Sequence, residues 1–205
     1  MRFRLDGRSL ARDLAPVLAT SLLLWPALAL AHAEQGKAAG FLAGLRHPIS
    51  GLDHVLAMVS VGLWGAQLGA PAVWLLPVTF PVVMAMGGML GLVGVPLPGV
   101  EVAIALSGIA LGLAVLAEWR PKLPVAAVLV GFFAVFHGHA HGTELPAGAS
   151  GLHYSLGFVM ATGTLHAVGI AIGAVHRWGW GRVALRVAGA GVAGTAAFFL
   201  WRAVS

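Results

Sequence analysis

The chain has 205 residues, of which 59% are hydrophobic and only 9% are charged, and its mean hydropathy is +0.92. Long apolar runs with short polar joints exclude an ordinary soluble domain and indicate an integral membrane protein. The chain has no cysteine, which excludes disulfides, thiolate metal sites and thiol redox chemistry. Its net charge of +5 lies on the termini and joints, where it indicates membrane topology and not nucleic-acid binding.

The N-terminal segment has the features of a cleavable signal peptide. Arginines precede an apolar run, and Ala29-Leu30-Ala31 is a small-x-small cleavage site. Cleavage there makes residues 1–31 the signal peptide and residues 32–205 the mature transmembrane domain. His32 then becomes the N-terminus, with an amine and an imidazole free to bind metal. Cleavage after Ala33 and an uncleaved first helix stay open as alternatives.

Six apolar segments follow, each with roughly the 20 residues that cross a ~30 Å hydrocarbon core. They cover residues 48–69, 72–94, 100–118, 123–145, 151–175 and 181–201. Pro77 and Pro81 predict a kink in the second segment. Four glycine pairs have the GxxxG spacing that lets helices approach closely. They are Gly87/Gly91, Gly108/Gly112, Gly138/Gly142 and Gly169/Gly173. We therefore predict an all-α membrane protein, a bundle of six transmembrane helices after the signal peptide.

Basic residues in the joints predict the orientation of this bundle. Arg120 and Lys122 lie between the third and fourth segments. Arg177 and Arg182 lie between the fifth and sixth, and the other joints have neither lysine nor arginine. The positive-inside rule places the two basic joints in the cytoplasm and both mature termini outside. An exported N-terminus agrees with the signal peptide.

The stretch 136–144, Phe-His-Gly-His-Ala-His-Gly-Thr-Glu, carries the most informative chemistry in the chain. His137, His141 and Glu144 have the spacing i, i+4, i+7 and share one face of a helix, whereas His139 points elsewhere. Ionisable side chains at membrane depth are costly and indicate function. Imidazoles beside a carboxylate are typical ligands of borderline divalent metals. We expect a metal site here, with a structural or supporting role for His139.

Other segments bring further candidate ligands to the same outer half of the predicted bundle. His47, Asp53 and His54 lie at the outer end of the first segment, and Glu101 lies in the first turn of the third. His47, which precedes a proline, is also typical of a helix cap at the interface, and Asp53 has the alternative role of orienting an imidazole. Glu101 has the alternative of an interfacial side chain. His166 lies near or past the midplane, as either an inner way-station for an ion or a packed, hydrogen-bonded histidine.

Two of these motifs resemble those of a known family, the HupE/UreJ nickel and cobalt permeases. The family motifs HxxxxxDH and FHGxxHGxE are matched by His47-(five residues)-Asp53-His54 and by Phe136-His137-Gly138-x-Ala140-His141-Gly142-x-Glu144. Further similarity lies in Val100-Glu101-x-Ala103-Ile104-Ala105-x-Ser107 and in Thr164-Leu165-His166-x-x-Gly169. The resemblance covers the mature chain, and it implies a cleaved signal peptide, six spans and uptake of Ni²⁺ or Co²⁺.

We therefore expect a secondary transporter in the bacterial inner membrane, and not an enzyme, that takes up Ni²⁺ and/or Co²⁺ for metalloenzyme maturation. The expected metal ligands are His47, Asp53, His54, Glu101, His137, His141, Glu144 and His166. No catalytic residue and no prosthetic group is expected. The expected partners are the ion, the bilayer, and either a second copy of the chain or an intracellular metallochaperone. The main alternative is a membrane-embedded Zn²⁺-dependent hydrolase that uses the same histidines and acids to activate water.

Overall fold

The computed structural model describes residues 38–145 and 148–205, and all regular secondary structure in those residues is helical. The expectation of an all-α chain is therefore confirmed for this part of the protein. The predicted signal peptide, its cleavage site and His32 lie outside the described residues.

Six of the helices correspond to the six predicted apolar segments. They are α2 (Leu52–Leu68), α3 (Ala72–Leu92), α4 (Val100–Leu116), α5 (Leu123–Thr143), α6 (Gly151–Gly173) and α7 (Gly179–Val204). A short 3-10 helix, η1 (Ala174–Arg177), lies between α6 and α7. By length and composition, α3, α5, α7 and the continuous segment of α6 with η1 are long enough to cross a membrane. The helix α4 is apolar but shorter, with 17 residues.

The structure corrects the start of the first predicted segment. A separate helix, Ala38–Ser50, precedes α2 and meets it at an angle of 82°. His47 and Pro48 lie in the last turn of this helix, so the interpretation of His47 as a cap at a helix start is wrong. Gly51 ends the helix because its backbone is extended, with φ −104° and ψ 120°. The helix Ala38–Ser50 and α2 have the length and composition of a fifth candidate span only when the two are taken together.

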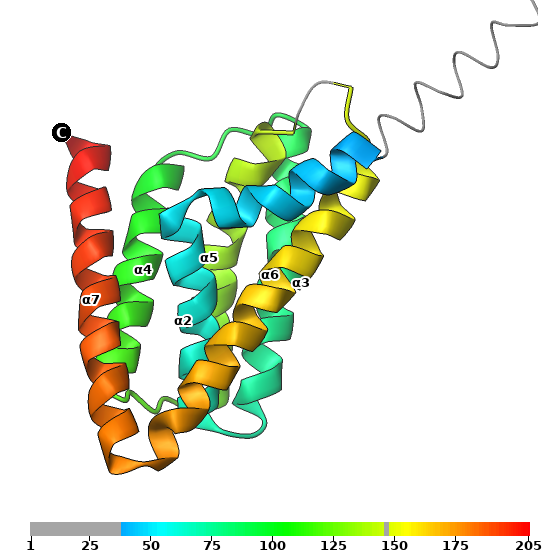
Figure 1. Cartoon of the computed structure of the whole chain (residues 1–205). Coiled ribbons are helices and arrows are strands. Elements are labelled where there is room, and N and C mark those ends of the chain that lie inside the picture. Colours follow the sequence, from blue (N-terminus) through cyan, green and yellow to red (C-terminus); the bar gives the residue numbers. More distant parts are fainter. Residues whose placement is uncertain (1–37, 146–147) are drawn as a thin grey trace, which may run out of the picture.

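Helix Ala38–Ser50 crosses one end of the bundle in front of α6 (Figure 1). Its position is fixed by close backbone contact. Gly44 lies against the Tyr154 carbonyl of α6, and Gly157 of α6 lies against the Phe41 carbonyl, with no room for a Cβ at either glycine. This contact delivers the end of the helix, with His47, to the interior of the bundle.

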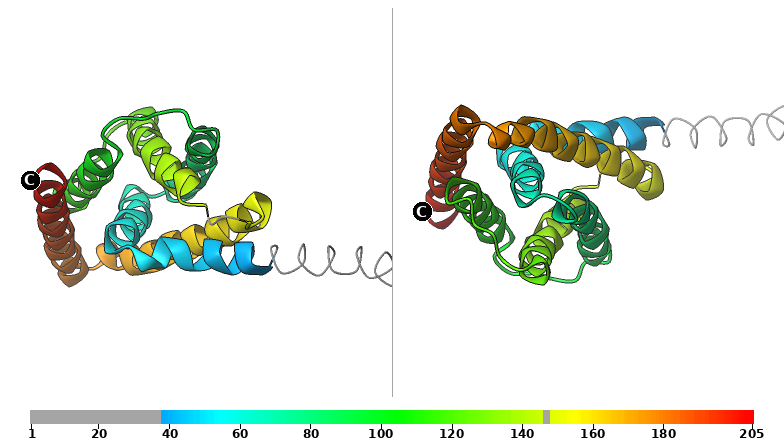
Figure 2. Two further views of the ribbon diagram at one scale, coloured as in Figure 1. Left: turned by 90° about the horizontal axis from the view of Figure 1, so that it is seen from above. Right: turned by 90° about the horizontal axis from the view of Figure 1, so that it is seen from below.

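The innermost helix is α2. Figure 2 shows it between α4, α5 and α6, and nearly every residue from Ala57 to Gln67 is buried. Two of its polar side chains donate hydrogen bonds to backbone carbonyls at the C-terminal end of α4 and just after it. Trp64 Nε1–H donates to the Trp119 carbonyl over 2.9 Å, and Gln67 Nε2–H donates to the Val115 carbonyl over 3.2 Å.

All four predicted GxxxG pairs lie where helices meet. Between α3 and α5, Gly87 faces the Val135 carbonyl and Gly138 faces the Met84 carbonyl, and neither contact leaves space for a methyl group. The pairs on α4 and α6 lie in the same way against α7 and α2. The glycines therefore set three close helix pairs, α3–α5, α4–α7 and α2–α6.

The two ends of the bundle differ in chemistry. The helix Ala38–Ser50, the C-terminal end of α5 and the C-terminus of the chain lie at one end, which we call the histidine end (Figure 1). The connection from α4 to α5, with Arg120 and Lys122, and η1, with Arg177, lie at the other, which we call the basic end. The predicted candidate ligands lie towards the histidine end, apart from the deeper His166.

Candidate metal site

Four histidines and one glutamate form a compact group at the histidine end. This group, the histidine cluster, consists of His47, His54, His137, His141 and Glu144. Its members come from the helix Ala38–Ser50, the first turn of α2, and the last two turns of α5 with the residue that follows. Donors from three separate helices therefore meet at one place, and all five are residues that the sequence motifs single out.

The imidazole rings follow one another from the surface inward. The ring centroids are 4.6 Å apart for His47 and His141, 4.6 Å for His141 and His54, and 4.9 Å for His54 and His137. The side chains of Glu144 and His47 are 55% and 26% exposed. By contrast, His141 is 4% exposed and His137 is fully buried. The cluster is thus a short series with an open and a closed end.

The open end of the cluster holds a carboxylate–imidazole pair. His47 Nε2 lies 2.9 Å from Glu144 Oε2. These two residues and His141 each offer one ligand atom, and the three atoms lie within 4.8 Å of one another. Small adjustments of these side chains would bring the three atoms around one divalent cation.

Hydrogen bonds determine which nitrogen of His54 faces the cluster. His54 Nδ1–H donates to the Asp53 carboxylate over 3.0 Å. His54 Nε2 is therefore left as the acceptor nitrogen, and it is buried without a partner. A carboxylate that takes the second N–H of an imidazole is the usual support of a metal-binding histidine. The structure thus gives Asp53 the orienting position considered for it from the sequence.

Ser107 of α4 does the same for His137. Its hydroxyl donates to the Ile104 carbonyl over 2.6 Å, so its oxygen is the acceptor for His137 Nε2–H at 2.9 Å. The other nitrogen, His137 Nδ1, is left unprotonated, buried and without a partner. His137 is thus presented to the cluster through a defined lone pair.

His141 lies between His47 and His54 in this series, and both of its nitrogens are buried without a partner. Together with His54 Nε2 and His137 Nδ1, they make four such atoms within the cluster. A buried polar group left unsatisfied costs about 1–3 kcal/mol, so folded proteins rarely gather several of them in one place. Convergent imidazole nitrogens are the donors that nickel, cobalt, zinc and copper(II) prefer. The chemistry of this donor set fits a borderline divalent cation.

The local sequence of α5 explains why its histidines point at α2. His137 and His141 are one helical turn apart, and each is followed by a glycine that packs against the backbone of α3. His139 faces away from the cluster, and its Nε2–H donates to the Val95 carbonyl over 2.7 Å. His139 therefore ties α5 to the connection between α3 and α4, the structural role expected for it.

Comparison with known proteins gives the same assignment as the motifs. The profile of the family described as HupE / UreJ protein matches residues 20–199. The chain is also 49% identical over 177 residues to "Protein HupE" of Rhizobium leguminosarum bv. viciae, a match that covers 86% of this chain and 93% of that protein. The chain belongs to the HupE/UreJ family. The resemblance inferred from two motifs is thereby confirmed, although no solved structure matches.

Two predicted ligands of this HupE/UreJ chain, Glu101 and His166, lie apart from the cluster, and so does a further histidine, His153. Glu101 is exposed in the first turn of α4, and in the described residues it makes no contact with the cluster. His153 is half-buried and lies with Nδ1 2.9 Å from the Ser150 hydroxyl. His166 is deeper in the bundle and 1% exposed, and the Phe80 ring contacts both it and His137.

Some side chains that shape the HupE/UreJ site are not apparent from sequence. Ser107 has a weak signal, since it ends the third-segment motif, but nothing there indicates that it supports His137. Tyr154 is buried, its hydroxyl has no partner, and its ring lies 6.0 Å from that of His47. Phe80 is one of several buried aromatic residues, and only its three-dimensional position distinguishes it.

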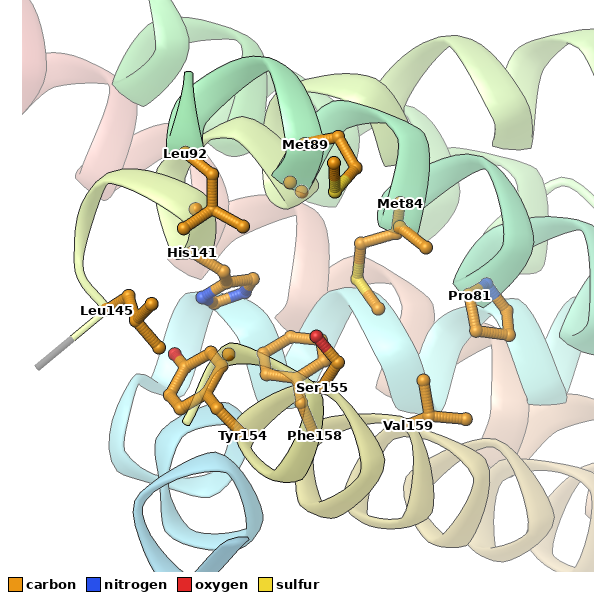
Figure 3. Close-up of a pocket in the computed structure, with 15 residues that line it drawn as sticks. Pro81, Met84, Met89, Leu92, His141, Leu145, Tyr154, Ser155, Phe158 and Val159 are labelled. Atoms are coloured by element: carbon orange, nitrogen blue, oxygen red, sulfur yellow. The ribbon is translucent and has the colours of Figure 1, made fainter. Parts of the chain in front are cut away.

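A cavity of about 150 Å³ borders the cluster between α3, α5 and α6. Figure 3 shows His141 there among apolar side chains, with Leu92 of α3 on one side and Tyr154 and Phe158 of α6 on the other. The walls of the cavity are almost entirely apolar. Apart from His141, the cavity therefore offers few ligand atoms for a hydrated ion.

Proposed function

We propose that this HupE/UreJ chain is a permease that takes up Ni²⁺ and/or Co²⁺ through the histidine cluster, across the bacterial cytoplasmic membrane. The observation that carries the proposal is the convergence of buried, unpartnered imidazole nitrogens from α2 and α5 behind an exposed carboxylate. The nickel and cobalt permease activity implied by the family resemblance supports the same function.

Capture of the ion begins at the open end of the cluster. In the free protein His47 Nε2–H donates to Glu144, and an incoming cation takes the place of this proton. The negative charge of Glu144 offsets part of the cost of removing water from the ion. His141, the next ring in the series, passes the ion from this pair to His54 and His137. Such a series must bind strongly enough to dehydrate the ion and weakly enough to release it.

The donor set also limits the cargo. Imidazole nitrogen suits nickel, cobalt, zinc and copper(II), whereas Mg²⁺ and Ca²⁺ prefer oxygen ligands. The Irving–Williams order means that these donors alone do not select Ni²⁺ or Co²⁺ over Cu²⁺, so selection rests on geometry and on metal supply. Within the described residues, no feature favours the zinc hydrolase considered as the alternative.

The proposal includes six membrane spans, α2 to α7, after a cleaved signal peptide, with the histidine end and both mature termini in the periplasm. The positive charges of Arg120, Lys122 and Arg177 at the opposite end support this orientation. The 17-residue helices α2 and α4 rise only ~26 Å at 1.5 Å per residue. They span the membrane where the bilayer is locally thinned. The helix Ala38–Ser50 lies along the periplasmic surface.

Uptake of radiolabelled Ni²⁺ and Co²⁺ into cells that express the chain tests this function. We expect uptake above that of vector-only cells. Uptake should fall about ten-fold or more in His137→Ala, which loses a ligand atom, and in Asp53→Ala, which loses the carboxylate that orients His54. Excess unlabelled Zn²⁺ and Cu²⁺ should compete.

The matched control is His153→Ala, since this histidine lies at the same end but bonds to Ser150. It should retain wild-type uptake, with all variants present in the membrane at equal amounts. Unchanged uptake in both cluster variants would refute the proposed function.

A further inference from the structure

The side chain of Phe80 contacts both His137, the innermost ring of the histidine cluster, and the deeper His166. The Phe80 ring centroid lies 5.4 Å from that of His137 and 5.6 Å from that of His166, and Phe80 is fully buried. Both contacts are edge-on, with interplanar angles of 63° and 84°. The innermost ring of the cluster and His166 therefore both contact the same benzene ring.

A second group of unpartnered polar atoms includes His166, which contacts Phe80, and Thr162. Thr162 and His166 are one turn apart on α6, and they are 0% and 1% exposed. The hydroxyl of Thr162 and both nitrogens of His166 have no hydrogen-bond partner. Neither residue belongs to the histidine cluster, so a second polar site is present deeper in the bundle.

A backbone oxygen of α3 lies beside the same group. Pro81 has no N–H, so the carbonyl of Pro77 lacks its regular helical donor. This carbonyl lies close to the His166 ring, although without the geometry of a hydrogen bond. Imidazole nitrogen, a hydroxyl and a free carbonyl together form a donor set that suits a divalent cation.

Two further residues continue the same face of α6, nearer the basic end. Ile170 and Ala174 follow Thr162 and His166 at successive four-residue intervals. Both line a pocket of about 300 Å³ that also contains His176. The deeper donors thus lie between the histidine cluster and an open pocket at the opposite end of the molecule.

We propose that Phe80 is the gate of the permease, and that His166, Thr162 and the Pro77 carbonyl form a second binding site for the same ion, which we call the inner stop. This inference rests on the proposed function. The apolar ring closes the route by excluding water and offering no ligand. The ring must swing aside for an ion to pass from His137 to His166. Pro77 and Pro81, on either side of Phe80, remove backbone hydrogen bonds from α3 and allow it to bend there.

Transport by purified protein in proteoliposomes tests the gate, with Co²⁺ binding measured on the same samples. Phe80→Trp enlarges the ring and should lower the initial rate about ten-fold or more, while Co²⁺ still binds to the outer cluster as in the wild type. Phe80→Ala removes the barrier and should raise the rate per folded protein several-fold.

The matched control is Phe133→Ala, which removes a buried ring from α5 that pairs with the Phe132 ring and, in the described residues, with no histidine ring. It should leave the transport rate per folded protein unchanged. If both Phe80 variants transport like the wild type, or if Phe80→Ala merely behaves like Phe133→Ala, the gate is overturned. A wild-type protein that neither binds nor transports Ni²⁺ or Co²⁺ would overturn the proposed function itself.

Cysteine chemistry gives a second test that does not depend on transport, because the natural chain contains no cysteine. Thr162→Cys places one thiol in the proposed inner stop, one helical turn from His166. A membrane-impermeant thiol reagent added from the histidine end should label it slowly, and about ten-fold faster when Phe80→Ala is added. Equal labelling rates in the two backgrounds would overturn the gate.

The inner stop is tested by equilibrium binding of Ni²⁺ to the purified protein. His166→Ala should lose one bound ion per chain, while the sites that depend on His137 keep their affinity. An unchanged number of bound ions would overturn the inner stop.

Discussion

His54 and His137 are each held by one polar neighbour, and this determines what they can do. Asp53 and Ser107 each accept one ring N–H, so the remaining nitrogen of each histidine is an unprotonated acceptor. An imidazole fixed in this way enters metal coordination without first losing a proton or rotating. We therefore expect the residues that support the proposed site to contribute to its metal affinity along with the ligands.

The first prediction concerns Ser107. Ser107→Ala removes the acceptor for His137 Nε2–H, so the ring loses its fixed orientation and His137 Nδ1 is no longer held towards the cluster. We expect the affinity for Ni²⁺ to fall about 10–100-fold. The measurement is isothermal titration of the purified protein in detergent.

A matched control is Ser60→Ala, which removes another fully buried hydroxyl, one without a hydrogen-bond partner. It should leave Ni²⁺ affinity unchanged. If Ser107→Ala binds Ni²⁺ as tightly as Ser60→Ala does, the supporting role of Ser107 is wrong.

At the scale of the helices, the glycine contacts determine where the functional side chains lie. On α3, Phe80, Met84, Gly87 and Gly91 are buried on the face that packs against α5. The missing side chains let the two backbones touch, which brings Phe80 within 5.4 Å of the His137 ring. Close packing of α3 on α5 is thus a condition for both the cluster and the gate.

The second prediction tests this contact. Gly87→Ala places a methyl group against the Val135 carbonyl, where there is no room for it. We expect a loss of about 1–3 kcal/mol in the free energy of unfolding, as for other overpacked sites. The measurement is denaturant unfolding in detergent, followed by tryptophan fluorescence.

Gly131→Ala is the control for the same change on α5. A Cβ at Gly131 would meet only side-chain methyls, at 3.7 and 3.8 Å, which is ordinary contact distance. It should be neutral or stabilising by up to about 1 kcal/mol, because alanine favours helix more than glycine does. Equal unfolding curves for Gly87→Ala and Gly131→Ala would show that the α3–α5 contact is looser than described.

At the scale of the whole molecule, the distribution of polarity is the reverse of that in a soluble protein. Large apolar side chains face outward, such as Val82 at 58% and Val187 at 68% exposed. His137, His166 and Ser107 are buried inside. A bilayer is the solvent that suits such a surface, and the buried polar groups define the route that an ion would take.

The third prediction concerns the orientation of the chain in the membrane. Single introduced cysteines report it, because the natural chain contains no cysteine. Ser205→Cys, at the C-terminus on the histidine end, should react with an impermeant thiol reagent added to spheroplasts. Lys122→Cys, at the basic end, should react only after the membrane is opened, because the positive-inside rule places that end in the cytoplasm. The reverse pattern would invert the proposed direction of uptake.

The sequence alone determined the helical class, the family and the identity of the five cluster residues. It could do so because apolar run length reports spans, and because ionisable groups at membrane depth are too costly to be incidental. The spacing of His137, His141 and Glu144 fixed their common face, since helical geometry is local. The four-residue spacing of the glycine pairs indicated close helix contacts for the same reason.

Only the tertiary structure decided which residues meet across helices. The bend at Gly51 brings His47 to Glu144, a contact that no local pattern indicates. The structure also shows Glu101 exposed, the Ser107 hydroxyl against His137 Nε2, and the Phe80 ring in contact with both His137 and His166. These outcomes depend on how closely and at what angle whole helices pack. That packing is the sum of contacts between distant residues, and it cannot be read from any one segment.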